Sequence, residues 1–113
     1  MSDDASAPEA GPLSGVRVLE MGSFIAGPFA GQLLADYGAE VIKVEPVKGG
    51  DPMREWGITH DGESLWWPAI ARNKKSIALD LRAPECREII LRVITHNVMI
   101  VIRVRVFYRA PPT

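Results

Sequence analysis

The sequence predicts an α/β fold built on an open parallel sheet with flanking helices. Three features predict it: a β-branched, apolar segment at Val16–Leu19, a helical repeat of apolar residues after it, and a second β-branched segment at Val41–Val44. A strand, a helix and a strand of these lengths form two parallel strands joined by a right-handed crossover. Ligands of such sheets bind beyond the carboxyl ends of the strands, which here are Gly22–Pro28 and Glu45–Asp51.

A turn and a helix separate the two predicted strands. Gly22 and Gly27 bracket the turn, and Pro28 suits the first helical position, because the amide hydrogen that proline lacks would be unpaired there. Gly38 suits the end of the helix, where a left-handed residue is common. The apolar residues that recur at helical spacing, and that we expect the helix to bury, are Ala30, Leu33, Leu34 and Tyr37.

The middle of the chain is predicted to be irregular. Residues 47–62 are rich in Gly, Pro and charge and predict a loop, within which Asp51 and Arg54 are expected to pair with each other. Residues 64–71 fit either a short helix or a buried extended segment. Large aromatic side chains are costly to leave in water, so this part of the chain is not expected to be disordered; the residues concerned are Trp56, Trp66 and Trp67.

The last third of the chain predicts a strand, a helix and a strand. Alternation of polar and apolar residues at 76–81 predicts a third strand, and residues 98–106 predict a fourth. Residues 84–95 predict an amphipathic helix in which Glu88 and Arg92 are correctly spaced for an ion pair. The apolar face of this helix comprises Cys86, Ile89, Ile90, Val93 and Ile94.

Length and composition favour one globular domain. The chain has 113 residues, of which 47% are apolar and 24% charged, and its net charge of −1 gives no general attraction to nucleic acid or to an anionic membrane. The single cysteine, Cys86, excludes an internal disulfide and is expected to be a buried structural thiol. We expect a disordered leader at 1–12, a domain at 13–106 and an irregular tail at 107–113, with no secretory signal and no membrane span.

Physical chemistry alone leaves the binding function open. The turn at 22–28 is either a cradle for a phosphate or carboxylate or a close-packed strand–helix junction that needs small residues. The basic cluster Arg72–Lys75 either holds phosphates or is a solvated turn. The glycine fingerprints of dinucleotide sites and P-loops are absent, and His60 and His96 lack the spacing of metal ligands.

Several sequence motifs carry more information than the periodicity. In unbroken order they are Leu13–Glu20, Ala26–Pro28, Leu34–Pro46, Gly50–Arg54 and Arg72–Leu81. Together they resemble the amino-terminal region of class III coenzyme A transferases, a family that includes formyl-CoA transferase, carnitine CoA-transferase and alpha-methylacyl-CoA racemase. The resemblance runs from about Leu13 to Thr95.

The resemblance implies a fold and an activity. It implies that the chain is the first part of a large α/β domain with a Rossmann-like open parallel sheet, in a cytoplasmic enzyme whose two subunits interlock as a homodimer. Coenzyme A would be a substrate, with no permanently bound cofactor, and CoA would move between acyl-CoA thioesters and carboxylic acids. The nucleophile would be an aspartate downstream of the matched region. A non-catalytic CoA-binding or interaction remnant and a racemase-type enzyme remain alternatives.

The resemblance also implies part of a CoA site. Ile25 stands where formyl-CoA transferase has a glutamine, which argues against formyl or oxalyl specificity, and Pro46 stands where that enzyme has a CoA-contacting arginine. Arg82 is expected to approach a phosphate, and the cluster lysines are nearby candidates. The expected CoA-binding residues are Ile25, Ala26, Lys74, Lys75, Leu79, Asp80, Leu81 and Arg82.

The carboxyl-terminal end departs from the family pattern. Relatives continue the fourth strand into a Glu-Asn-Phe motif that contacts CoA, whereas this chain has Ile102–Val104 there. We therefore expect a truncated or frameshifted chain after about Asn97. The apolar run Val98–Ile102 would also leave an unpaired strand edge, which favours association.

Overall fold

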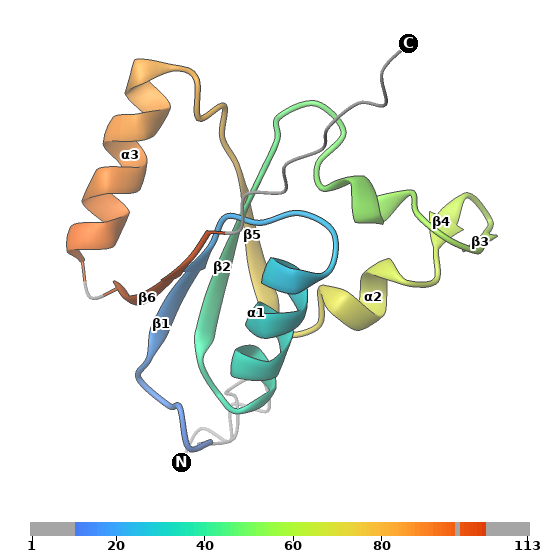
Figure 1. Ribbon diagram of the computed structural model, residues 1–113, viewed down its shortest axis with the longest axis horizontal. Helices are drawn as coiled ribbons and strands as arrows, with labels where there is room; N and C mark the ends of the chain where they lie inside the picture. Colours follow the sequence, from blue (N-terminus) through green and yellow to red (C-terminus); the bar gives the residue numbers. More distant parts are fainter. Residues whose placement is uncertain (1–10, 97, 104–113) are drawn as a thin grey trace, which may run out of the picture.

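A parallel four-stranded sheet forms the centre of the computed structural model in Figure 1, which describes residues 11–96 and 98–103. The strand order is β5-β2-β1-β6, and each neighbouring pair is parallel. The predicted α/β fold with an open parallel sheet is confirmed. The strands are β1 (Arg17–Glu20), β2 (Glu40–Glu45), β5 (Lys74–Ala78) and β6 (Val98–Ile102).

One helix packs on each face of the sheet. Helix α1 (Ala26–Asp36) connects β1 to β2, and helix α3 (Pro84–Thr95) connects β5 to β6. Side chains alternate between the two faces along each strand, so two separate apolar cores form. The core on the α1 face comprises Val18, Ala35, Ala39 and Val41, and the core on the α3 face comprises Leu19, Val44 and Ile90.

Helix α1 buries only part of the predicted face. Leu34 is partly buried against the core, whereas Leu33 and Tyr37 are exposed, as is Phe29. The residues that α1 buries are small or compact, namely Gly27, Pro28, Gly31 and Ala35. The helix lies close to the sheet, so that only small side chains fit beneath it, and apolar periodicity alone does not reveal such a packing.

The region between β2 and β5 is more structured than the predicted loop. It contains a single 3₁₀ turn, η1 (Pro52–Arg54), and an antiparallel hairpin of β3 (Thr59–His60) and β4 (Glu63–Ser64). The short helix α2 (Trp67–Ile70) settles the question left open for residues 64–71. Two tryptophans are ordered by contacts: Trp56 meets the Phe24 ring edge-on at 6.5 Å, and the Arg54 guanidinium lies 4.2 Å from the centre of the Trp67 ring.

The carboxyl-terminal elements match the sequence with two exceptions. Helix α3 begins and ends where predicted, and its Glu88–Arg92 ion pair forms at 3.1 Å. Strand β5 begins two residues and ends three residues before the predicted 76–81. Cys86 is only partly buried and Ile89 is exposed, whereas Ile90 is buried and Val93 and Ile94 pack, partly buried, against the same core.

The predicted chain ends fall largely outside the described residues. Most of the predicted leader (1–10), the end of the predicted fourth strand (104–106) and the predicted tail (107–113) lie there. Gly11, assigned to the leader, accepts a hydrogen bond from the Ser14 amide and packs against Tyr37 and Gly38. None of the helices in residues 11–96 and 98–103 is both long enough and apolar enough to cross a membrane.

Candidate functional site

A cleft of about 590 Å³ opens at the carboxyl ends of three strands. Its walls are Met21–Ser23 after β1, Val44–Lys48 at the end of β2, and Leu79–Arg82 after β5. This is the position where open parallel sheets bind ligands. Both predicted strand ends, 22–28 and 45–51, therefore contribute residues to one cavity.

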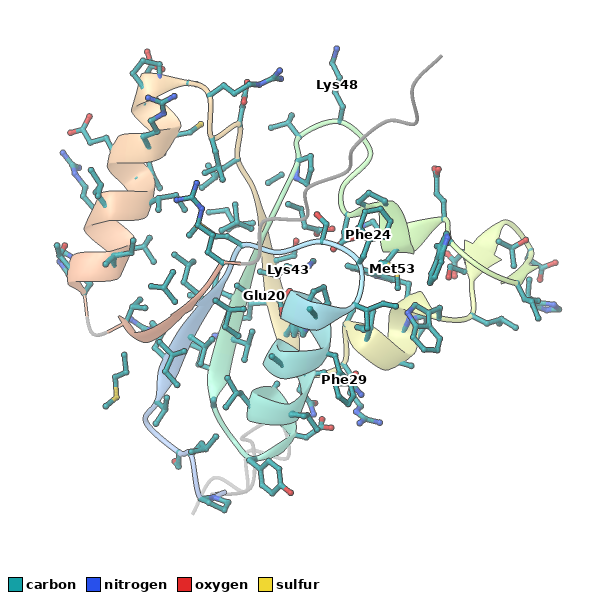
Figure 2. All side chains as sticks on the ribbon, in the orientation of Figure 1. Glu20, Phe24, Phe29, Lys43, Lys48 and Met53 are labelled. Carbon is teal, nitrogen blue, oxygen red and sulfur yellow. The ribbon has the colours of Figure 1, made fainter. Side chains whose placement is uncertain are left out.

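The cleft combines an apolar floor with cations at its rim. Val44 and Leu79 belong to the core on the α3 face and form part of the floor. At the rim, the Arg82 side chain is 92% exposed and its Nε lies 3.2 Å from the Asp80 carboxylate. Figure 2 shows Lys48 extending away from the loop after β2. Such a site suits a ligand with an apolar or aromatic body and an anionic group.

The Leu79–Arg82 wall is held by a local turn. The Arg82 backbone amide donates a hydrogen bond to Asp80 Oδ1 at 3.0 Å, and the Arg82 Nε donates to the same oxygen. These two bonds, first from the backbone and then from the guanidinium, lower the pKa of Asp80. Because the exposed guanidinium has no other partner among the described residues, it can exchange Asp80 for a phosphate at little cost.

The turn between β1 and α1 is a close-packed junction, as one of the two interpretations of its sequence predicts. A Cβ atom on Gly22 would lie 3.2 Å from the Gly27 Cα, so the junction is close-packed and needs glycine. Gly22 and Ser23 also line the cleft. Ile25 and Ala26 follow on the far side of the turn, where both are exposed but neither lines the cleft.

The residues of the basic cluster 72–75, which leads into β5, differ in their exposure. Arg72 and Lys75 are exposed and pair with Asp36 and Glu40, at 2.6 and 2.8 Å. The Arg72 hydrogen bond lowers the pKa of Asp36 and the Lys75 hydrogen bond lowers that of Glu40. The interpretation of the whole cluster as a solvated turn is wrong for Lys74, whose side chain is 3% exposed. Neither lysine lines the cleft.

Buried charges occupy the α1 face of the sheet beside the cleft. Glu20 and Lys43 are directly opposite each other on β1 and β2, and Lys43 Nζ lies 2.7 Å from Glu20 Oε2 and 2.6 Å from Asp51 Oδ2. Lys74 Nζ lies 2.7 Å from Glu20 Oε1 and donates to the Pro28 carbonyl at 2.6 Å. We call these four side chains (Asp51, Lys43, Glu20 and Lys74) the charge ladder; Figure 2 places Glu20 and Lys43 between α1 and the sheet.

Helix α1 is shaped to the charge ladder. A Cβ atom on Gly31 would lie 1.9 Å from Glu20 Oε1 and 3.4 Å from Lys74 Cε. Any side chain at Gly31 would therefore displace the buried carboxylate. This contact explains why α1 presents glycine, rather than a large apolar residue, to the sheet.

A third buried carboxylate, Glu45, fixes the loop after β2. The Arg54 guanidinium binds Glu45 through two bonds of 2.7 Å, and the Asp51 amide donates to Glu45 Oε1 at 2.9 Å. Ser76 also donates to Glu45. The Arg54 hydrogen bond is the main cause that lowers the pKa of Glu45 to about 2. The predicted Asp51–Arg54 ion pair is wrong, because each residue pairs with a side chain of β2.

The sequence predicted most of the cleft lining. Ser23, Val47 and Lys48 lie within the predicted strand ends 22–28 and 45–51, and the resemblance implied Leu79–Arg82, whereas Met21 was not singled out. The signal for Met21 was positional, because it lies two residues after the first predicted strand. Among the described residues, no three His, Cys, Asp or Glu side chains gather as a metal site.

Comparison with known proteins identifies the family. The profile of CoA-transferase family III matches residues 13–102. The chain belongs to this family.

Relatives and solved structures agree with this assignment. The chain is 62% identical over 90 residues to "Succinyl-CoA--D-citramalate CoA-transferase" of Chloroflexus aurantiacus, covering 79% of this chain and 22% of that relative. It is 48% identical over 80 residues to the human "Succinyl-CoA:glutarate CoA-transferase", covering 70% and 18%. A crystal structure of a CAIB/BAIF family protein from Brucella suis superimposes with a TM-score of 0.73 at 39% identity, covering 82% of this chain and 25% of that one.

The chain matches only a small part of each relative. The chain spans about a fifth of the length of the curated relatives it resembles, at 22% and 18%. The matched part carries the parallel sheet and the cleft.

Proposed function

We propose that this chain forms part of the CoA site of a CoA-transferase, which moves CoA between an acyl-CoA thioester and a carboxylic acid. The observation that carries the proposal is the cleft at the carboxyl ends of β1, β2 and β5. One complete wall of it, Leu79–Arg82, is a segment that the family resemblance implies for CoA binding. CoA acts here as a substrate and not as a resident cofactor.

The cleft suits the nucleotide end of CoA. Val44 and Leu79 offer an apolar surface to the adenine, and Arg82 pairs with a phosphate in place of Asp80. Ile25 and Ala26 remain candidates for contacts to the rest of the CoA molecule, outside the cleft. Lys74 and Lys75 are weaker candidates, because carboxylates already engage both amines.

We infer dicarboxylic acids as the acyl groups. The relatives named above carry succinyl, citramalate and glutarate in their names, all of which are dicarboxylates. An isomerase-type function is less well supported, because the relative named "2-methylfumaryl-CoA isomerase" is only 41% identical over 85 residues. Ile25, in place of the glutamine of formyl-CoA transferase, argues against a formyl or oxalyl group.

The chemical step is assigned to residues outside this chain. We propose that the nucleophilic aspartate belongs to a family segment downstream of the matched region, that the enzyme works as an interlocked homodimer, and that it is cytoplasmic. The 113-residue chain is then expected to bind CoA without transferring it. Transfer of CoA from succinyl-CoA to citramalate or glutarate by the pure chain would contradict this assignment.

Calorimetric titration of CoA into the folded chain tests the proposal. One-site binding is expected, weakened by roughly ten- to a hundredfold by Arg82→Ala, since a charge-assisted bond to phosphate is worth about 1.5–3 kcal/mol. Arg92→Ala is the matched control, because Arg92 is an exposed arginine of α3 paired only with Glu88 among the described residues. Equal losses in the two variants, or no heat from a folded chain, would contradict the assigned cleft.

A further inference from the structure

Lys43 has an unusual environment for a lysine. Its side chain is 2% exposed, and its ammonium has three oxygen partners: Glu20 Oε2 at 2.7 Å, the Gly22 carbonyl at 3.0 Å and Asp51 Oδ2 at 2.6 Å. The ammonium donates hydrogen bonds to Glu20 and Gly22, and its contact with Asp51 is an ion pair. Because it is buried among these groups, the ammonium is not available to a ligand and acts on its three partners.

The three partners come from different segments, two of which border the cleft. Gly22 lines the cleft in the turn after β1. Asp51 ends the loop that starts with the cleft residues Pro46, Val47 and Lys48. Lys43 therefore joins the turn after β1 to the far end of the loop after β2, across the sheet edge where the two walls of the cleft begin.

Asp51 transmits this restraint to the loop. Its Oδ1 accepts a hydrogen bond of 2.9 Å from the Met53 amide, and its own amide donates to Glu45 Oε1 at 2.9 Å. The side chain is 1% exposed. Its second oxygen pairs with Lys43, so removing that cation removes one of the contacts that hold this end of the loop, while the bond from the Asp51 amide to Glu45 remains.

Packing alone does not require these charges. Two lysines and two carboxylates are removed from water, which is costly, and apolar side chains of the same volume fill such a space as well or better. Gly31 must also stay without a side chain to accommodate Glu20. The charges instead fix directions, because the Lys43 ammonium donates to Glu20 Oε2 and to the Gly22 carbonyl and pairs with Asp51 Oδ2.

We propose that Lys43 is a positioning residue that holds the two walls of the CoA cleft in their relative place through Gly22 and Asp51. This inference rests on the proposed function for its binding consequence. The geometric part, the restraint of residues 21–26 and 46–51, stands without CoA.

A charge-balanced double variant tests the inference. In Lys43→Met/Asp51→Asn one cation and one anion are lost together, while the Glu20–Lys74 pair at 2.7 Å is kept. The matched control is Glu88→Gln/Arg92→Met, which removes an exposed ion pair on α3, where neither residue lines the cleft. If the double variant does not fold, Asp51→Asn alone is used as the milder variant. Asparagine keeps a side-chain oxygen that accepts from the Met53 amide.

Hydrogen exchange and CoA titration are read together on the full 113-residue chain. Exchange of the peptides covering 21–26 and 46–51 is expected to rise about tenfold or more, while β1 and β2 peptides remain protected. The Kd for CoA is expected to rise about tenfold, since small misplacements of site groups are costly. The control should change neither quantity.

The outcomes separate the two proposals. If the wild-type chain binds CoA and the Lys43 variants bind it equally well with unchanged loop exchange, the positioning role is overturned. If the wild-type chain binds no CoA, the proposed function fails, and the exchange data still decide whether Lys43 restrains the loops. Uniformly increased exchange over the whole sheet would show a merely structural role and would also overturn the inference.

Discussion

The two faces of the sheet are built from the same strands but on opposite principles. Under α3 the buried side chains are apolar, with Leu19, Val44 and Ile90 at the centre. Under α1 the apolar residues Val18 and Val41 give way, towards the carboxyl ends, to buried Glu20, Lys43 and Glu45. Strands β1 and β2 thus place apolar side chains on the α3 face and, near their carboxyl ends, charged side chains on the α1 face.

The difference separates stability from positioning. Apolar burial is non-directional and stabilises any arrangement that removes the same area from water. Ion pairs in a buried network add little net stability but strongly disfavour every arrangement that breaks them. The charged face is the one whose side chains bond to the turn and the loop that border the cleft.

Of the variants that test this comparison, Lys43→Met is expected to lose the most stability. It leaves the carboxylates of Glu20 and Asp51 buried, with one cation fewer between them, and breaking such a pair costs about 3–5 kcal/mol. Urea unfolding should show the loss. Removing the Asp51 charge as well should recover much of it, and a double variant no more stable than Lys43→Met would contradict the account.

Leu19→Ala breaks the apolar face instead. Leu19 is fully buried against Val44 and Ile90, and its truncation should cost about 3 kcal/mol from lost burial and the residual cavity. The same urea experiment measures it. Exchange of the loop 46–51 relative to β2 should stay unchanged, and selective loosening of that loop would show that the two faces do not divide their tasks.

Acidification probes the charged face through Glu45. Its folded-state pKa, about 2, lies below the ordinary value of 4.5, so the stabilisation is complete above pH 4.5 and is lost as the pH falls towards 2. We expect about 2 kcal/mol, reduced by solvent around the half-exposed Arg54.

The measurement is a difference between two proteins. Wild type and Glu45→Gln are unfolded in urea between pH 7 and pH 2.5, so that the other carboxylates cancel. Wild type should lose more stability over that range. Parallel curves would mean that Glu45 has the same pKa in the folded and unfolded states.

Elements with a simple repeat were predictable, and residues with distant partners were not. Helix α3 was predicted to the residue, because proline opens it and its apolar positions follow one period. The buried face of α1 was predicted only in part, because Leu34 packs on the apolar core but the charge ladder beneath Gly31 defines the rest of that face. A missed but findable element is the β3–β4 hairpin, where Asp61-Gly62 is a strong turn signal and both residues have positive φ.

In the candidate site, too, residues within a sequence motif were predictable and residues with distant partners were not. The wall Leu79–Arg82 could be found because a contiguous sequence motif carries it. Lys74 could not be placed, because its neighbours Arg72, Asn73 and Lys75 are exposed and only the β2–β5 register puts its amine beside Glu20. Ion pairs across strands depend on register, which local sequence does not encode.

The smallest loss of stability is expected for an exposed ion pair, which serves as the reference for the buried charges. Glu88 and Arg92 are paired at 3.1 Å on α3 but are 66% and 75% exposed, so Glu88→Gln should cost no more than about 0.5 kcal/mol. In 1 M salt this cost should vanish, because exposed charges are screened. The cost of Lys43→Met should persist under the same conditions, since its partners are buried. A salt-sensitive Lys43→Met alongside a salt-insensitive Glu88→Gln would mean that water reaches the charge ladder, and the directional restraint argued from its burial would not hold.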